Sequence, residues 1–97
     1  MVWRVIFSDR SRSDLQKIVT FIARDDPKAA GRFGERLIAA AESLTAAPNM
    51  GSAMPERPGT RFLVVASYLI IYRAVGTRRE IRILRFWHGA RKRRPLR

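Results

Sequence analysis

His88 is the only histidine of the chain and stands in the C-terminal segment FWHGARKRR. Histidine is the side chain whose ordinary pKa suits acid–base chemistry near neutral pH. No Ser or Cys nucleophile lies near His88 in the sequence, so acyl transfer is not supported. The remaining enzymatic hypothesis is metal-free RNA cleavage, in which a base activates a 2′-hydroxyl and arginines neutralise the phosphate. The alternative is a structural histidine that forms hydrogen bonds at the end of a strand.

Four arginines fall on segments that the sequence predicts as strands: Arg61, Arg73, Arg82 and Arg85. By the two-residue period of a strand, Arg85 shares a face with Ile81 and Ile83, so its face is mostly apolar. A charged side chain there must reach the sheet edge or line a wet concave surface, because a buried unpaired charge is costly. Two interpretations stay open. The arginines form structural pairs with Glu80, Glu56 or backbone carbonyls, or they form a cationic groove on the sheet face that the helices leave uncovered.

The composition predicts one small basic domain, residues 1–97. The formal net charge is +12, and seventeen of the twenty basic residues are arginine, which suits bidentate recognition of phosphate or carboxylate. We therefore expect an acidic partner. The chain has no cysteine, and its eight carboxylates and single histidine show no metal-ligand spacing, so no metal or other cofactor is predicted. The N-terminal apolar run is too short for a signal sequence or a membrane span, and a cytoplasmic protein is expected.

The C-terminal segment RKRRPLR, residues 91–97, contains five basic residues: Arg91, Lys92, Arg93, Arg94 and Arg97. Such a run is usually a solvated, mobile terminus. If all five side chains contacted phosphates instead, binding would weaken with salt at a log–log slope of roughly −4. The adjacent Phe86 and Trp87 could stack on bases, although aromatic residues at strand ends are more often core residues or partner anchors.

Two helices are predicted in the first half of the chain. Residues 2–7 form a short strand, and Ser8 or Asp9 then caps a helix over residues 9–24, whose apolar stripe is Leu15, Ile18, Val19 and Ile22. Asp26 and Pro27 fit the start of a second helix that runs to about Ala47. Its buried side is expected to contain Ala30, Phe33, Leu37, Ala40, Ala41 and Leu44.

The second half is strand-like. Residues 47–59 carry three prolines and two glycines, which predicts a loop. Strands follow at residues 61–66, 68–75 and 80–87, the last two joined by the turn GTRR with Gly76 free to take a positive φ. The predicted order is therefore β-α-α-β-β-β.

Four segments together resemble the RelE/ParE superfamily of bacterial type II toxins, and the ParE branch most closely. They are SDLQKIVTFIARDDPKAAGRFGERL, LTAAPNMG, RFLVVASYLIIYRAV and IRILRFWHGARKR, and the resemblance extends from Val2 to Arg93. It implies an α+β fold in which a helical hairpin packs on a twisted antiparallel sheet. The element order read from the residues agrees with that fold.

The resemblance also implies a toxic protein that is neutralised by a tightly bound antitoxin. Such a partner typically lays a helix along the helical hairpin and adds an extended segment near the sheet. An acidic antitoxin would complement the charge of +12, and its other half is expected to bind DNA. The residues expected to contact the antitoxin lie on the two helices: Leu15, Ile18, Ile22, Phe33, Arg36 and Leu37.

The two branches of the superfamily imply different activities. RelE-like members resemble ribosome-dependent mRNA endonucleases and often place an Arg three positions before the tyrosine that is Tyr72 here; that position is Leu69. A Tyr after the last strand is also absent. ParE-like members resemble DNA gyrase inhibitors, and the segments YLIIYR and HGAR fit them better.

We therefore predict a non-enzymatic toxin that acts on DNA gyrase. The residues expected to contact the target are Trp87, His88, Arg91, Lys92, Arg93 and Arg94. The alternative is a RelE-type, metal-independent endoribonuclease that uses four residues: His88, Arg85, Arg73 and Arg61.

Overall fold

The computed structural model describes residues 2–89. Its elements are β1 (Arg4–Phe7), α1 (Asp9–Ala23), α2 (Pro27–Ser43), β2 (Ser52–Ala53), β3 (Thr60–Val65), β4 (Tyr68–Val75) and β5 (Glu80–His88). The α+β class and the order strand, two helices, strands are confirmed, and the two-residue β2 is an addition within the predicted loop. Within residues 2–89 no helix is long and apolar enough to cross a membrane.

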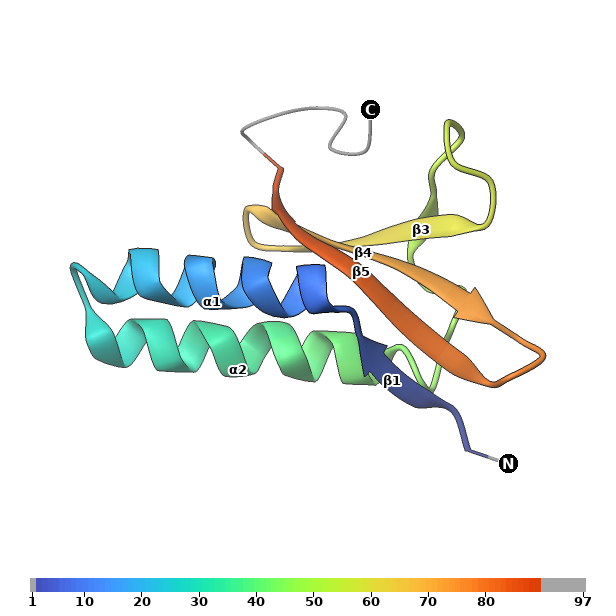
Figure 1. Ribbon diagram of the computed structural model, residues 1–97, viewed down its shortest axis with the longest axis horizontal. Helices are drawn as coiled ribbons and strands as arrows, with labels where there is room; N and C mark the ends of the chain where they lie inside the picture. The colour runs from blue at the N-terminus through green and yellow to red at the C-terminus, as the bar shows by residue number, and fades with distance from the viewer. Residues whose placement is uncertain (1, 90–97) are drawn as a thin grey trace.

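The five strands form one sheet in the order β1-β5-β4-β3-β2, with the helical hairpin against it (Figure 1). Neighbours from β2 to β5 are antiparallel, as predicted, whereas β1 runs parallel to β5 at the edge. The sheet is therefore mixed. Parallel neighbours require a long connection, and here the helical hairpin and three strands separate β1 from β5 along the chain.

Both helices begin at the predicted caps. The Ser8 hydroxyl accepts the N–H of Ser11 at 3.0 Å, and the Asp26 carboxylate accepts the N–H of Ala29 at 3.1 Å. Each bond satisfies one of the N–H groups that a helix start leaves without a partner. Pro27 occupies the first turn of α2, where its missing N–H costs nothing.

α2 ends at Ser43, four residues before the predicted end at Ala47. The next residues form tighter bonds between residues three apart, such as Thr45 N–H to Glu42 C=O at 3.1 Å, and the Thr45 hydroxyl donates to the same carbonyl at 2.8 Å. Hydroxyl groups compete in this way with the helical bond pattern. Pro48 further disfavours a helical residue at position 47.

The core lies between the helical hairpin and one face of the sheet. Its buried members on the helices and just after α2 are Ile18, Leu37, Ala41 and Leu44, and those on the strands are Val65, Ile70, Tyr72, Ile81, Ile83 and Phe86. The helices therefore cover one sheet face, and the other face carries Phe62, Ile71 and Arg73 at alternating positions.

A β-bulge in β5 changes which side chains face the helices. Ile71 pairs with Arg85 and Tyr72 pairs with Ile83, so Leu84 is an extra residue. The prediction that Arg85 shares a face with Ile81 and Ile83 was therefore wrong. The extra residue reverses the alternation and moves Arg85 to the face opposite the helices.

Tyr72 fixes the loop that follows α2. It is fully buried, and its hydroxyl donates to Pro48 C=O at 2.8 Å and accepts the N–H of Gly51 at 2.9 Å. A Cβ on Gly51 would lie 2.7 Å from Phe62 O and 2.8 Å from the Tyr72 hydroxyl, so only glycine fits there without a shift. The loop is thus held from within the core.

The turn between β4 and β5 differs from the prediction. Gly76 does not take a positive φ; Arg79, at the end of the turn, does, with φ 52°. An L residue with a side chain is disfavoured in this left-handed region, where glycine is at home. The turn therefore places its strained residue at an arginine.

Candidate functional site

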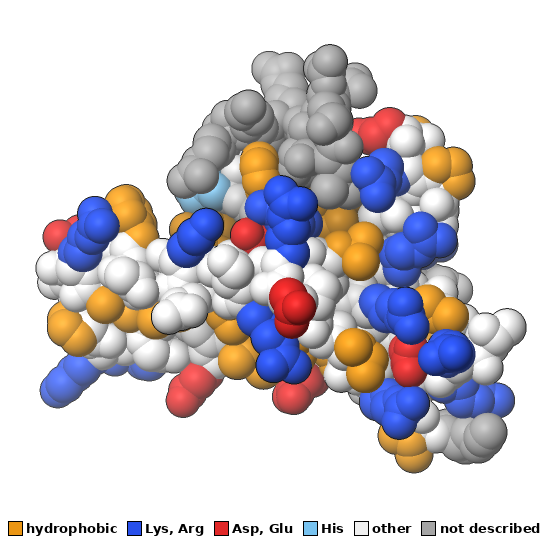
Figure 2. All heavy atoms as spheres, viewed as in Figure 1, with side chains coloured by type: hydrophobic (Ala, Val, Ile, Leu, Met, Phe, Trp, Pro, Cys, Tyr) orange, Lys and Arg blue, Asp and Glu red, His pale blue; other side chains and the backbone are white. Residues whose placement is uncertain are grey.

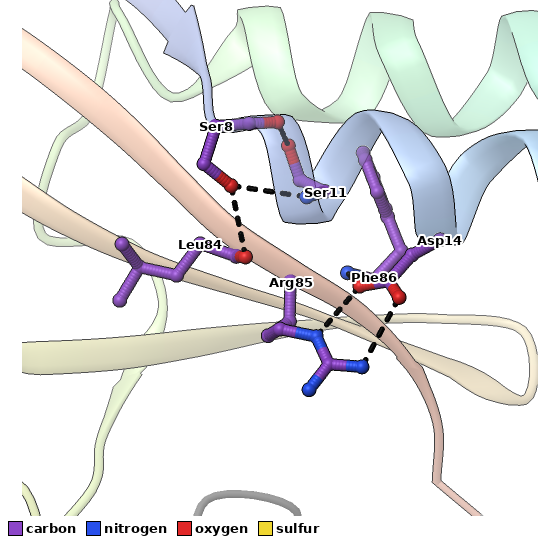
Figure 3. Close-up of polar contacts among 6 residues, drawn as sticks. All are labelled: Ser8, Ser11, Asp14, Leu84, Arg85 and Phe86. Carbon is purple, nitrogen blue, oxygen red and sulfur yellow. Dashed lines mark hydrogen bonds and ion pairs between the residues drawn. The ribbon is translucent and has the colours of Figure 1, made fainter.

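The outer edge of β5 is held by α1 side chains beyond the point where β1 ends. β1 pairs with β5 only as far as Ile83, and the N–H of Ser8 then donates to Ile83 C=O at 3.0 Å. The Ser8 hydroxyl donates to Leu84 C=O at 3.1 Å while it caps α1 through Ser11 (Figure 3). One serine thus closes the edge of the bulge and starts the helix.

Asp14 continues this edge one turn further along α1. Its carboxylate accepts the N–H of Phe86 at 3.1 Å and receives Arg85 through Nε at 2.7 Å and Nη2 at 3.1 Å (Figure 3). The two charged side chains are only 15% and 13% exposed, and the Arg85 guanidinium lies 4.8 Å from the ring centre of Trp87. Arg85 is therefore a paired, stacked residue, in line with the structural interpretation of the strand arginines.

The structure does not bring the four residues of the endonuclease hypothesis together. Arg61 donates through Nη1 to Gly51 C=O at 2.7 Å and so supports the loop after α2. Arg73 is opposite Arg82, which is six residues from His88 along β5, or about 20 Å at the usual rise of a strand. Arg73 and His88 therefore lie at opposite ends of the sheet.

His88 packs against an aromatic neighbour. Its ring meets Tyr68, its cross-strand partner, edge to face at 4.9 Å between centroids, and Phe33 of α2 lies 5.4 Å from Tyr68 on a tilted plane. Within residues 2–89 His88 forms no hydrogen bond or ion pair with a side chain that would orient it as a base. The same part of the chain has no group of three or more His, Cys, Asp or Glu residues placed to hold a metal ion.

A groove of about 920 Å³ runs between α1 and the end of β5; we call it the α1–β5 groove. Trp87 and His88 line it from the strand, and Lys17, Phe21 and Arg24 line it from the helix. Phe21 is 64% exposed, which is unusual for a large aromatic side chain on a helix. The groove therefore combines an accessible apolar side chain with two cations.

The sequence missed Phe21 because it lies outside the apolar stripe of α1. Such a stripe faces the core, and the structure shows this for the residues expected to contact the antitoxin. Leu37 is fully buried and Ile18 is nearly so, and both belong to the core cluster. Leu37 does not reach the surface, whereas Ile18 also lines the α1–β5 groove, so a contact with the antitoxin stays a prediction for this set.

The other residues of that set are more accessible. Leu15, Ile22 and Phe33 are half-buried against the core, and Arg36 is exposed. Ile22, Phe33 and Arg36 surround a shallow hollow of about 360 Å³ on the helical hairpin, which we call the hairpin hollow. Arg36 lies 6.0 Å from the ring centre of Phe33, so the hollow presents a cation above an aromatic face.

The remaining predicted target contacts, Arg91, Lys92, Arg93 and Arg94, lie outside the described residues. Trp87 and His88 are consecutive residues of β5, and both line the α1–β5 groove. The groove is thus the described surface that contains the predicted target residues.

Comparison with known proteins places the chain among bacterial toxins. The sequence model of the family described as "ParE toxin of type II toxin-antitoxin system, parDE" matches residues 5–93. The protein named Toxin RelE1 of Caulobacter vibrioides is 34% identical over 97 residues, a match that covers 96% of this chain and 100% of that protein.

Two solved structures share the fold. One is described as the chromosomal ParDE TA system from P. aeruginosa, with a TM-score of 0.74 and 24% identity, covering 91% of this chain and 96% of the other. The second is the toxin–antitoxin complex RelBE2 from Mycobacterium tuberculosis, with a TM-score of 0.65 and 23% identity, covering 91% of this chain and 99% of the other.

Proposed function

The chain belongs to the ParE family of toxins from type II toxin–antitoxin systems, and from this premise we propose that it acts on DNA gyrase by binding, without catalysing a reaction. The observation that carries the proposal is the dispersal of the candidate catalytic residues. An RNA-cleaving site needs a base and phosphate-binding cations around one reacting atom. Here Arg85 is neutralised by Asp14, Arg61 supports a loop, and Arg73 lies about 20 Å from His88 by strand rise.

The proposed target contact is the end of β5. Trp87 and His88 provide an aromatic surface beside the exposed Phe21, and Arg91, Lys92, Arg93 and Arg94 follow in the sequence. Aromatic side chains rimmed by cations are typical of protein contacts. The basic segment gives this contact a positive charge that suits a target bound to DNA.

The partner of the toxin is its cognate antitoxin, and we propose that it contacts the hairpin hollow. Phe33 and Ile22 offer apolar contacts there, and Arg36 offers a cation. The antitoxin is proposed to be acidic, to bind DNA through its other half and to form a hetero-oligomer with the toxin. The toxin is proposed to act in the cytoplasm.

Two assays run side by side test the proposed activity. Purified toxin is added to a gyrase supercoiling reaction and, separately, to a translation reaction in which mRNA cleavage is mapped. Inhibited supercoiling with intact mRNA supports the proposal, whereas mRNA cut only on ribosomes, with gyrase unaffected, refutes it. Both assays are needed because the family model is that of ParE toxins, whereas one relative is named Toxin RelE1, after the RelE branch.

A His88→Ala variant tests the role of the histidine. If His88 is a packing and contact residue, the variant keeps its fold and antitoxin binding and loses only part of its effect on gyrase. Abolished mRNA cleavage in a folded, antitoxin-binding variant would instead identify His88 as a base and revive the endonuclease hypothesis.

A charge reversal tests the antitoxin contact. Arg36→Glu is expected to weaken antitoxin binding by about tenfold or more, because a rim cation becomes a like charge for an acidic partner. Arg12→Glu, an exposed residue at the start of α1, is the matched control. Equal affinities for both variants would place the antitoxin elsewhere.

A further inference from the structure

Five arginines gather at the end of the sheet where β4 turns into β5; we call them the hairpin-end arginines. They are Arg4 on β1, Arg73 on β4, Arg78 and Arg79 in the turn, and Arg82 on β5, and all five are exposed. Figure 2 shows basic side chains gathered over this end of the sheet. This end is opposite the α1–β5 groove, which lies at the far end of β5.

The strand register places these charges close to one another. Arg73 and Arg82 are direct cross-strand neighbours, and Arg4 is paired in register with Glu80, two residues before Arg82. Like charges directly opposite one another destabilise a sheet. The arrangement therefore acts against the fold unless anions meet it.

One carboxylate, Glu80, pairs with two of these five arginines. Glu80 binds Arg4 through Oε2 and Arg82 through Oε1, both at 3.2 Å, and its own side chain is only 6% exposed. Both of its oxygens are thus occupied. Arg73, Arg78 and Arg79 have no hydrogen bond or ion pair from their side chains within residues 2–89.

The backbone conformation at Arg79 also indicates a functional role for this surface. Arg79 has φ 52°, a conformation that glycine adopts without strain. Strained positions frequently serve function, and an arginine gives the backbone no advantage there. The guanidinium of Arg73 lies over Gly59, whose added Cβ would be 3.0 Å from Nη2.

We propose that the hairpin-end arginines bind the phosphate backbone of duplex DNA without reading its sequence. Arginines clustered on one surface match the dense, regular charge of a duplex, and phosphate contacts need no base-specific partner. This inference concerns a surface distinct from the proposed target contact and does not depend on which protein the toxin inhibits.

Two other polymers fit the surface less well. An acidic protein would need apolar anchors in pockets, and neither the α1–β5 groove nor the hairpin hollow is lined by any of these arginines. Ile6, in register with Arg82, is an exposed apolar side chain, but it lines neither pocket. Single-stranded RNA would need aromatic rings for base stacking. Phe86 and Trp87 of β5 lie at the other end of the strand, and Trp3, next to Arg4, is half-buried against the core.

The test measures binding of the full-length toxin to a labelled mixed-sequence duplex over a range of salt concentrations. The triple variant Arg73→Gln, Arg78→Gln, Arg79→Gln leaves both Glu80 ion pairs in place. If each arginine meets a phosphate, the log–log salt slope becomes shallower by about 2 to 3, and affinity at moderate salt falls between about tenfold and several hundredfold. Arg10→Gln, Arg12→Gln, Lys28→Gln removes the same charge from exposed helix positions and is expected to bind nearly as the parent does.

Arg79→Gly separates binding from folding. Glycine relieves the positive φ, so this variant is expected to melt at a higher temperature than the parent while its salt slope becomes shallower by about 1. Equal loss of affinity in the helix control, or no loss in the triple variant, overturns the proposal. A triple variant that binds DNA normally but binds the antitoxin weakly also overturns the proposal, because the surface would then serve an acidic protein. A toxin that binds single-stranded RNA more tightly than duplex DNA overturns it as well.

Discussion

Removal of the Asp14 carboxylate is the most informative perturbation of the fold, because three bonds converge on it. Two come from the Arg85 guanidinium and one from the N–H of Phe86. A hydrogen bond to a charged group contributes about 1.5 to 3 kcal/mol, and breaking one side of a buried ion pair costs about 3 to 5 kcal/mol. The pair is partly exposed, so we expect Asp14→Ala to cost about 3 kcal/mol, at the lower end of that range.

The measurement is urea denaturation followed by tryptophan fluorescence, since Trp87 lies against Arg85. In a thermal melt of a domain of this size, a loss of about 3 kcal/mol would appear as a fall in Tm of about 12 to 24 °C. Asp14→Asn keeps one acceptor for the N–H of Phe86 and is expected to lose about half as much. Asp25→Ala is the control, because this exposed carboxylate has no side-chain bond within residues 2–89, and it is expected to change stability by no more than about 0.5 kcal/mol.

A double substitution tests whether the loss of stability comes from the unpaired charge. Asp14→Leu combined with Arg85→Met removes both charges, and apolar residues of similar volume often replace a buried ion pair at little cost. The double variant should therefore be more stable than Asp14→Ala. If Asp14→Ala loses less than about 1 kcal/mol, or the double variant is no more stable than Asp14→Ala, the ion pair does not stabilise the contact between α1 and β5.

Three further outcomes follow from buried polar groups. Tyr72→Phe removes the hydroxyl that joins Pro48 and Gly51. It should lower stability by about 1 to 3 kcal/mol in urea denaturation, because a buried N–H and C=O lose their partner. Gly51→Ala should lower stability by about 1 to 3 kcal/mol because its Cβ would crowd Phe62 and Tyr72, and a near-neutral result would show that the loop moves freely. Burial opposes ionisation of Glu80, but hydrogen bonds from its two arginines outweigh it and hold the pKa of this carboxyl below its ordinary value. The ionised Glu80 therefore contributes its full stabilisation above the ordinary pKa of 4.5, and this stabilisation is lost as pH falls through the lower pKa of the folded state. Glu80→Gln should be less stable than the parent at neutral pH and should lose less stability in acid. Thermal melts across a range of pH measure both effects.

Local signals predicted most of the elements. Ser8 and Asp26 are helix caps whose bonds span three residues, and β4 and β5 are neighbours joined by a short turn, so each signal lies within one window of sequence. The end of α2 was predicted late, because the bonds of Ser43 and Thr45 hydroxyls to nearby carbonyls compete with the helix in a way that periodicity does not register.

Long-range features were beyond such signals. Asp14 and Arg85 are 71 positions apart, and nothing in the sequence near either residue indicates the other. The bulge at Leu84 depends on how β5 meets β4, and it reversed the predicted face of Arg85. The candidate site shared this limit, since the apolar stripe of α1 identifies the core side of the helix and leaves Phe21, on the accessible side, without a pattern.

The fate of the strand arginines explains why charge alone could not locate a site. Arg61 donates a hydrogen bond to a backbone carbonyl, and Arg85 forms an ion pair with Asp14. Neither guanidinium can bind a ligand without loss of a structural bond. Arg73 looks equivalent in the sequence, yet its neighbours across the sheet are Thr60 and Arg82, which offer it no carboxylate. An arginine becomes a candidate for recognition when the fold supplies no anion, and that depends on register. The excess positive charge of the described strands is therefore concentrated where β4 turns into β5, at the end of the sheet farthest from His88.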